Sequence, residues 1–192
     1  MFNINKIEKF ILTNSDNEEE KEILYFGVER FLIFCFGIII ILLSGVLLDE
    51  LPRTLVFVTC IFPLRQNAGG FHFNDSKKCT VCSLGLLIIS IKLMKIISLS
   101  SLCAILLSLI STGFILYFAP VGNKNRELDE LERKVYGRRT KCICLVENFL
   151  LLSFIIVNAN NWYQTIIFAE MITSFLVILG VVQEQYTKGE KY

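Results

Sequence analysis

Long uncharged apolar runs alternate with short polar segments along most of this chain. No charged residue falls within residues 31–48, 96–123 or 148–169. Because about 20 helical residues cross the hydrocarbon core of a bilayer, each of these runs is typical of a membrane-spanning helix. The pattern therefore predicts an all-α integral membrane protein.

We predict about six transmembrane helices, over residues 31–48, 51–65, 79–97, 99–120, 142–158 and 162–182. The second is short and contains Pro52, Arg53 and Pro63, which favours a tilted or irregular helix. The third and fourth come from one apolar stretch that is interrupted only by Lys92 and Lys95. Since this stretch is long enough for two bilayer crossings, it requires a tight hairpin near residues 95–100.

The first 30 residues follow a different pattern. Ile4, Ile7, Phe10 and Ile11 recur at helical spacing among charged residues, which predicts an amphipathic helix on the membrane surface. The polar residues 14–17 end this helix, and the three glutamates at 18–20 suit the first turn of the next one. The expected organisation is a cytoplasmic N-terminal segment 1–30, a six-helix domain 31–182 and a cytoplasmic tail 183–192.

Lys and Arg residues are distributed unevenly among the segments between the predicted spans. Sixteen of the 19 fall in the two termini, the second loop or the fourth loop, and only Arg53, Lys92 and Lys95 fall in the other loops. By the positive-inside rule, both termini and these two loops are cytoplasmic. The net charge is only +1, which gives no indication of nucleic-acid binding.

Two glutamates fall inside predicted spans, where a charge is costly and often functional. Glu147 lies near the cytoplasmic end of its span, so we expect it to reach the membrane interface. Glu170 and Lys92 lie at similar depth on the sixth and third spans, and we predict that they pair inside the bundle. In the alternative, Lys92 extends to the outer interface.

The second cytoplasmic loop, residues 65–79, holds the main candidate for chemistry. It contains His72, the only histidine, and Cys79 follows seven residues later. Asn74, Asp75 and Ser76 are good N-cap residues, so we expect Cys79 in the first turn of the third span. The helix dipole and the neighbouring lysines favour a thiolate there, and an imidazole folded back over the helix start can accept the thiol proton.

Two glycines precede this histidine. Each of the candidate residues in this loop also has an explanation that involves no catalysis. Gly69 and Gly70 would let the backbone turn tightly and approach a substrate carbonyl, although a simple turn also explains them. A lone histidine in a loop can be merely solvated. No third residue that orients the imidazole is evident, because helix capping is a sufficient explanation for Asp75.

The order Arg-x-x-Ala-x-Gly-x-His-x6-Cys over residues 65–79 resembles that of the accessory gene regulator B (AgrB) family, which are bacterial membrane cysteine endopeptidases. Residues 117–125, Tyr-Phe-Ala-Pro-Val-Gly-Asn-Lys-Asn, resemble the family's Ala-Pro turn and the basic stretch after it. The resemblance implies His72 as general base and Cys79 as nucleophile. It also implies roles for Arg65 and Gly70, which together with Gly69 we assign to substrate binding or positioning.

One departure from the family concerns residues 66 and 67. Family members can carry extra histidines or basic residues between the arginine and the base, where this chain has Gln66 and Asn67. The assignment of the base does not change, because His72 is the sole histidine.

The resemblance also implies a reaction and a location. The family cleaves the C-terminal tail from a short precursor peptide, here a peptide of the AgrD type, through an acyl-enzyme. A thiol or hydroxyl of the precursor then closes a thiolactone or lactone ring, which gives a quorum-sensing peptide. The implied location is the cell membrane, in contact with the lipid bilayer and with the active site at the cytoplasmic face. We expect neither a metal nor a cofactor, and a homodimer is left open.

Other function classes make different use of the same residues. Cys79 and Cys82 form a Cys-x-x-Cys pair, as in membrane thiol–disulfide oxidoreductases, but the charge pattern places them on the reducing side. A metal site of His72, Cys79, Cys82 and Cys142 lacks the paired ligand clusters of structural zinc. A non-enzymatic peptide exporter has no use for a His–Cys pair. Cys79→Ser and Cys82→Ser discriminate between them, because a peptidase loses cleavage only with the first.

Overall fold

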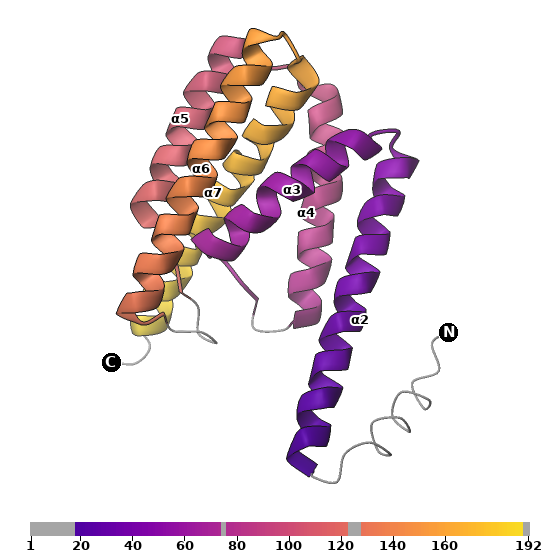
Figure 1. Ribbon diagram of the computed structural model, residues 1–192, viewed down its shortest axis with the longest axis vertical. Coiled ribbons are helices and arrows are strands. Elements are labelled where there is room, and N and C mark those ends of the chain that lie inside the picture. Colours follow the sequence, from indigo (N-terminus) through magenta and orange to yellow (C-terminus); the bar gives the residue numbers. More distant parts are fainter. Residues whose placement is uncertain (1–17, 74–75, 123–127, 190–192) are drawn as a thin grey trace. The chain divides into compact units, whose positions relative to one another are not determined.

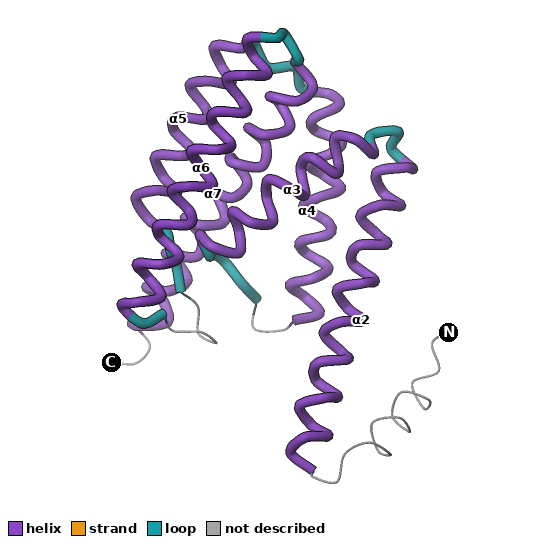
Figure 2. The backbone as a smooth tube through the Cα atoms, viewed as in Figure 1, coloured by secondary structure: helices purple, strands orange, loops and turns teal. Residues whose placement is uncertain are grey.

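The computed structural model describes residues 18–73, 76–122 and 128–189, which form six helices. The predicted N-terminal amphipathic helix, Asn74 and Asp75 lie outside these ranges. The helices are α2 (Glu18–Leu47), α3 (Leu51–Ala68), α4 (Ser76–Ile96), α5 (Ser101–Phe118), α6 (Glu130–Ile156) and α7 (Asn160–Gly189) (Figure 2). Over the described ranges the protein is all-α, as predicted, apart from one isolated bridge between Gly69 and Val121.

The chain divides into two compact units, residues 1–41 and residues 42–192. The described part of the first unit belongs to α2, which begins at Glu18, where the three glutamates predict a helix start. The second unit is a bundle in which α7 packs against α3, α4, α5 and α6 (Figure 1). All residues of the candidate site belong to this second unit.

Four of the described helices are long and apolar enough to cross a membrane. They are α2 over Lys21–Leu47, α4 over Lys78–Ile96, α5 over Ser101–Phe118 and α7 over Asn160–Tyr186. The other two are more polar, because α3 carries two arginines and the first half of α6 is charged. The expectation that all six helices span the membrane is therefore supported for four, and for α3 and α6 it stays a prediction.

Helix α6 begins at Glu130, well before the span predicted to begin at residue 142. Its start is fixed by a capping box. The Asp129 carboxylate accepts the backbone N–H of Glu132 at 2.6 Å, and the Glu132 carboxylate accepts the backbone N–H of Asp129 at 3.4 Å. The basic segment between the predicted fourth and fifth spans is thus largely helical, which hydropathy alone does not indicate.

The hairpin predicted near residues 95–100 is confirmed, because α4 ends at Ile96 and α5 begins at Ser101. Ser100 caps α5, since its hydroxyl oxygen accepts the backbone N–H of Cys103 at 3.3 Å. The Tyr163 hydroxyl donates to the Leu99 carbonyl at 2.8 Å. This bond attaches the hairpin to the beginning of α7.

The opposite end of the bundle collects the elements that form the candidate site. Figure 1 shows that α3, α5 and α7 end here and that α4 and α6 begin here. A compact apolar cluster supports this end, and its buried members are Leu64, Ala68, Ile115, Val121, Cys144 and Val177. Ala68, the last residue of α3, and Val121, in the segment after α5, belong to this cluster and anchor the loops on either side of it.

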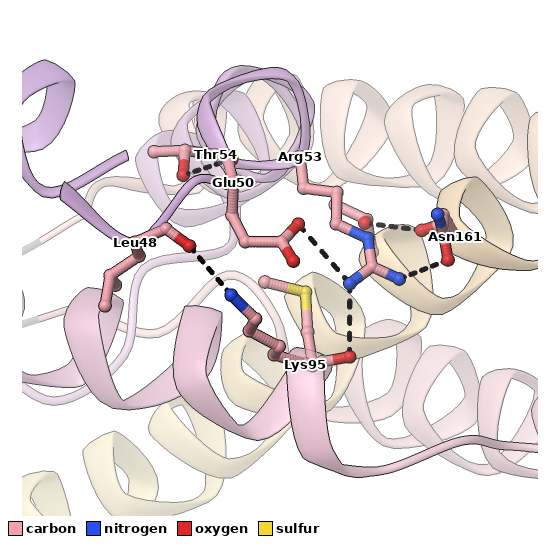
Figure 3. Close-up of polar contacts among 8 residues, drawn as sticks. Leu48, Glu50, Arg53, Thr54, Lys95 and Asn161 are labelled. Atoms are coloured by element: carbon pink, nitrogen blue, oxygen red, sulfur yellow. Dashed lines mark hydrogen bonds and ion pairs between the residues drawn. The ribbon is translucent and has the colours of Figure 1, made fainter. Parts of the chain in front are cut away.

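Arg53, near the start of α3, is buried among polar groups (Figure 3). Its Nη2 donates to Asn161 Oδ1 at 2.5 Å, and its Nη1 donates to the Met94 carbonyl at 3.3 Å. The Glu50 carboxylate lies 3.5 Å from Nη1. The guanidinium therefore joins the starts of α3 and α7 to the last turn of α4, where the carbonyl groups of a helix favour a cation.

The predicted ion pair between Lys92 and Glu170 is wrong. Lys92 is exposed, whereas Glu170 is fully buried. Ser108 Oγ donates to one carboxylate oxygen of Glu170 at 2.5 Å, and Asn148 Nδ2 donates to the other at 3.2 Å. Neutral groups from α5 and α6 therefore take the place of the expected cation. Glu147 is also buried, so the expectation that it reaches the interface is wrong as well.

Candidate functional site

The loop after α3 returns to the start of α4 and brings His72 beside Cys79. His72 Nδ1 lies 3.6 Å from Cys79 Sγ, within hydrogen-bonding range for sulfur. Cys79 is the fourth residue of α4 and lies in its first turn, as the N-cap residues predict. Both side chains are partly exposed, so a substrate can reach them.

The surroundings of His72 favour the neutral form of its imidazole. Burial lowers the pKa of His72 below its ordinary value of 6.5, and the positive charge of Arg65 lowers this pKa further. For Nδ1 to accept the thiol proton, the neutral ring must carry its own proton on Nε2. In this tautomer, His72 has the protonation state that a base for Cys79 requires.

Arg65, on the last turn of α3, binds the backbone of the loop that carries His72. Its Nη1 donates to the Gly69 carbonyl at 2.5 Å, and its Nη2 donates to the Phe71 carbonyl at 3.0 Å. One planar guanidinium therefore holds two carbonyls on either side of Gly70. It folds residues 69–71 back over the end of α3, immediately before His72.

Gly69 and Gly70 have φ angles of 73° and 115°, a region that favours glycine. A Cβ at Gly69 would overlap the carbonyl oxygen of Val121. A Cβ at Gly70 would lie 2.5 Å from Arg65 Nη1 and 2.7 Å from the carbonyl oxygen of Leu176. The glycines thus allow close packing of this loop against other parts of the chain, in addition to the approach to a substrate that the sequence suggests.

Backbone hydrogen bonds dock the loop on two later segments. Val121 N–H, just after α5, donates to the Ala68 carbonyl at 2.9 Å. Phe71 N–H donates to the Leu176 carbonyl of α7 at 2.8 Å. The loop is therefore held on both sides, although it has no regular secondary structure of its own.

Gln183 of α7 makes two hydrogen bonds to the backbone of His72. The sequence analysis did not identify Gln183 as part of the site. Its Nε2 donates to the His72 carbonyl at 2.8 Å, and the His72 N–H donates to its Oε1 at 3.3 Å. The two residues are 111 positions apart in the sequence. A single glutamine near the end of an apolar helix has no local pattern that predicts such a partner.

A cleft of about 360 Å³ opens beside His72. The segment after α5, which resembles the family's Ala-Pro turn, forms part of its wall. Its lining is Phe62, Arg65, Gln66, Asn67, Gly69, His72, Pro120, Val121, Gly122, Leu128 and Tyr136. A neighbouring cleft of about 440 Å³ shares three of these residues and continues to Arg138 and Arg139 on α6. His72 thus lines the first cleft, and two arginines of α6 line the second.

The other cysteines do not join His72 and Cys79. All seven cysteines are free thiols, and both Cys82 and Cys142 are exposed. Among the described residues, no group of three or more His, Cys, Asp or Glu side chains is arranged to hold a metal ion. The structure therefore brings together one thiol and one imidazole, and it gives no support to the four-residue metal site.

The family model described as accessory gene regulator B (AgrB) matches residues 4–178. The chain belongs to the AgrB family. The resemblance read from residues 65–79 and 117–125 is thus confirmed, and both segments lie inside the match. As an AgrB-family protein with four apolar helices of spanning length, it is a membrane protein that takes part in quorum-sensing peptide processing. No curated protein and no solved structure matches the chain.

Proposed function

We propose that this AgrB-family protein is a membrane cysteine endopeptidase that cleaves the C-terminal tail from an AgrD-type precursor peptide and closes the remaining peptide into a ring. The observation that carries this proposal is the 3.6 Å contact between His72 Nδ1 and Cys79 Sγ in the first turn of α4. A thiol beside an imidazole that can take its proton is the arrangement of a cysteine nucleophile and its base.

Each step of the proposed reaction has a group to carry it. His72 Nδ1 takes the proton from Cys79 Sγ, and the thiolate attacks the carbonyl carbon of the scissile peptide bond. The imidazolium then gives its proton to the leaving amine, and the precursor remains bound to Cys79 as a thioester. A precursor thiol or hydroxyl attacks the thioester, passes its proton through His72, and releases the Cys79 thiol.

The start of α4 also has donors for the negative oxygen that forms during the attack. The first four N–H groups of a helix, here those of Ser76 to Cys79, have no carbonyl partner within the helix. An oxyanion beside Cys79 would find these N–H groups close to the reacting carbon. Arg65, Gly69 and Gly70 act in positioning, because they shape the backbone that leads to His72.

Ring closure is favoured over hydrolysis because the attacking group belongs to the same peptide. Well-oriented intramolecular reactions reach effective concentrations of about 10⁵–10⁸ M, far above that of water. The two neighbouring clefts offer a surface along which a precursor can lie. We therefore expect a cyclic peptide as the product, and the reaction needs no metal or cofactor.

We further propose that the site faces the cytoplasm and that both termini lie on that side. The end of the bundle that holds the site also holds the end of α7 and the basic start of α6 (Figure 1). Arg53 lies at the opposite end, between the starts of α3 and α7. This arrangement agrees with the positive-inside rule, which places the basic end in the cytoplasm.

The test is co-expression of the protein with its precursor, followed by gel analysis and mass spectrometry. Cys79→Ala and His72→Ala should abolish cleavage while the protein still inserts into the membrane. Cys82→Ser is the matched control, since it removes a thiol one turn further along α4 and should process normally. Full processing by Cys79→Ala or His72→Ala overturns the catalytic assignment. A linear product that carries an added water, without the ring form, overturns the transfer step.

A further inference from the structure

We propose that Gln183 is a positioning residue for the base, and that it holds the His72 backbone so that the imidazole faces Cys79. This inference rests on the proposed function of His72 and Cys79. No role for the end of α7 follows from the family comparison, because the family match ends at residue 178. Three contacts join α7 to residues 70–72.

The first contact is the paired hydrogen bond between the Gln183 amide and the His72 peptide groups. Nε2 donates to the His72 carbonyl at 2.8 Å, and the His72 N–H donates to Oε1 at 3.3 Å. A side-chain amide that bonds both backbone groups of one residue fixes where its Cα–Cβ bond points. Among the described residues, Cys79 is the only hydrogen-bond partner of the imidazole itself. Its direction is therefore set through the backbone.

The second and third contacts bring α7 close enough for Gln183 to reach. Phe71 N–H donates to the Leu176 carbonyl at 2.8 Å. A Cβ at Gly180 would lie 2.5 Å from the carbonyl carbon of Gly70 and 2.6 Å from its Cα. These are backbone atoms, so a larger residue at position 180 must push the loop away from the helix.

Residues 176, 180 and 183 are spaced by four and three positions, and therefore lie on one face of α7. This face presents, in order, the carbonyl of Leu176, the bare backbone of Gly180 and the side-chain amide of Gln183. Leu176 bonds Phe71, Gly180 lies against Gly70 and Phe71, and Gln183 bonds His72. This face is the surface on which residues 70–72 dock, and Gln183 lies at its end nearest His72.

The experiment compares Gln183→Met with Gln185→Met. Methionine has a similar length to glutamine but makes neither hydrogen bond, and Gln185 is an exposed glutamine two residues further along the same helix. The rate of Cys79 alkylation by iodoacetamide at pH 7 is measured by mass spectrometry of the Cys79 peptide. The precursor-processing rate is measured in proteoliposomes, with the amount of inserted protein used to normalise both rates.

Gln183→Met should lower the alkylation rate toward that of His72→Ala. It should lower the maximal processing rate by about 10²-fold, with little change in KM, because a displacement of about 1 Å costs on this order. Gln185→Met should match the unchanged protein in both measurements. If Gln183→Met and Gln185→Met give equal alkylation and processing rates, the positioning role is refuted.

Gln183→Glu gives a second test that does not depend on the stability of the first variant. Its carboxylate still accepts the His72 N–H, but it cannot donate to the His72 carbonyl, and its negative charge should raise the pKa of His72. The acid limb of the pH profile of precursor processing, which reports the pKa of His72, should therefore move to higher pH. An unmoved profile with unchanged rates overturns the proposal. Processing by Cys79→Ala would refute the proposed peptidase instead, while the alkylation rates still test where the imidazole lies.

Discussion

Replacement of Arg65 separates two effects of this side chain on His72, the proposed base. Arg65 holds the Gly69 and Phe71 carbonyls, and its charge lowers the pKa of His72. Arg65→Met removes both the hydrogen bonds and the charge. Arg65→Lys keeps the charge but has a compact ammonium that cannot reproduce the fork of a guanidinium. The two variants should therefore differ in a predictable way.

The size of the geometric effect follows from the two hydrogen bonds. A hydrogen bond to a charged group contributes about 1.5–3 kcal/mol, and two bonds to one loop are not additive. The contacts of the loop with Val121, Leu176 and Gln183 remain in the variant and limit the loss. We expect a net loss of about 1.5–3 kcal/mol in loop docking, or roughly 10- to 100-fold in the maximal processing rate at 1.4 kcal/mol per tenfold.

The assay is the precursor-processing rate as a function of pH in proteoliposomes. The rate should rise as His72 loses its proton, so the midpoint of the acid limb reports the pKa of this base. For Arg65→Met, we expect a lower plateau and a midpoint at higher pH, because one of the two causes that lower the pKa is gone. For Arg65→Lys, we expect a lower plateau with a midpoint close to that of the unchanged protein.

Lys141→Met controls for the general loss of a positive charge, since Lys141 is an exposed cation on α6. It should leave the plateau and the midpoint unchanged. An Arg65→Met protein that processes at the full rate would refute the bracing role of Arg65. An unmoved midpoint in that variant would refute its electrostatic effect on His72.

Three further predictions follow from the described contacts. The acid limb of the unchanged protein should have its midpoint below pH 6.5, because the pKa of His72 is lowered and the base must be neutral; a midpoint above this value in a rate–pH profile contradicts it. Gly69→Ala should abolish or strongly reduce processing, measured on a gel at equal expression, because its Cβ would overlap the Val121 carbonyl oxygen. Glu170→Leu should lower the thermal stability of the detergent-solubilised protein by about 1–3 kcal/mol or more, because buried partners lose their acceptor, whereas the exposed Lys92→Leu should change it little.

Four helices of this protein could be predicted from the sequence because their apolar runs have the length that a bilayer requires. The hairpin between α4 and α5 followed from the length of one run, and the structure has it at residues 97–100. The start of α6 could not be found in this way. A capping box at Asp129 and Glu132 begins this helix in a charged segment, where hydropathy gives no signal.

The polar residues can be divided in the same way, into those that the local sequence predicts and those that it does not. His72 and Cys79 were found because they are close in sequence and because a helix start lies between them. The partners of Glu170 were not found, because Ser108 and Asn148 are single polar residues in different helices and nothing local connects them. Lys92 was predicted as the partner of Glu170 from its depth in the membrane alone, but its side chain is exposed. Long-range polar contacts depend on how helices rotate about their axes, and a single sequence does not specify that rotation.

The contact between His72 and Gln183, 111 residues apart, has a consequence for biosynthesis. A ribosome makes His72 and Cys79 well before the α7 face that docks their loop, since Gln183 follows His72 by 111 residues. If the loop needs its contacts with α7, then a chain that lacks α7 carries His72 and Cys79 without the geometry that the proposed reaction requires. Products of premature termination, and nascent chains still held by the translocon, would not cut neighbouring peptides. Synthesis of α7 would thus be the step that completes the proposed site, once, for each chain.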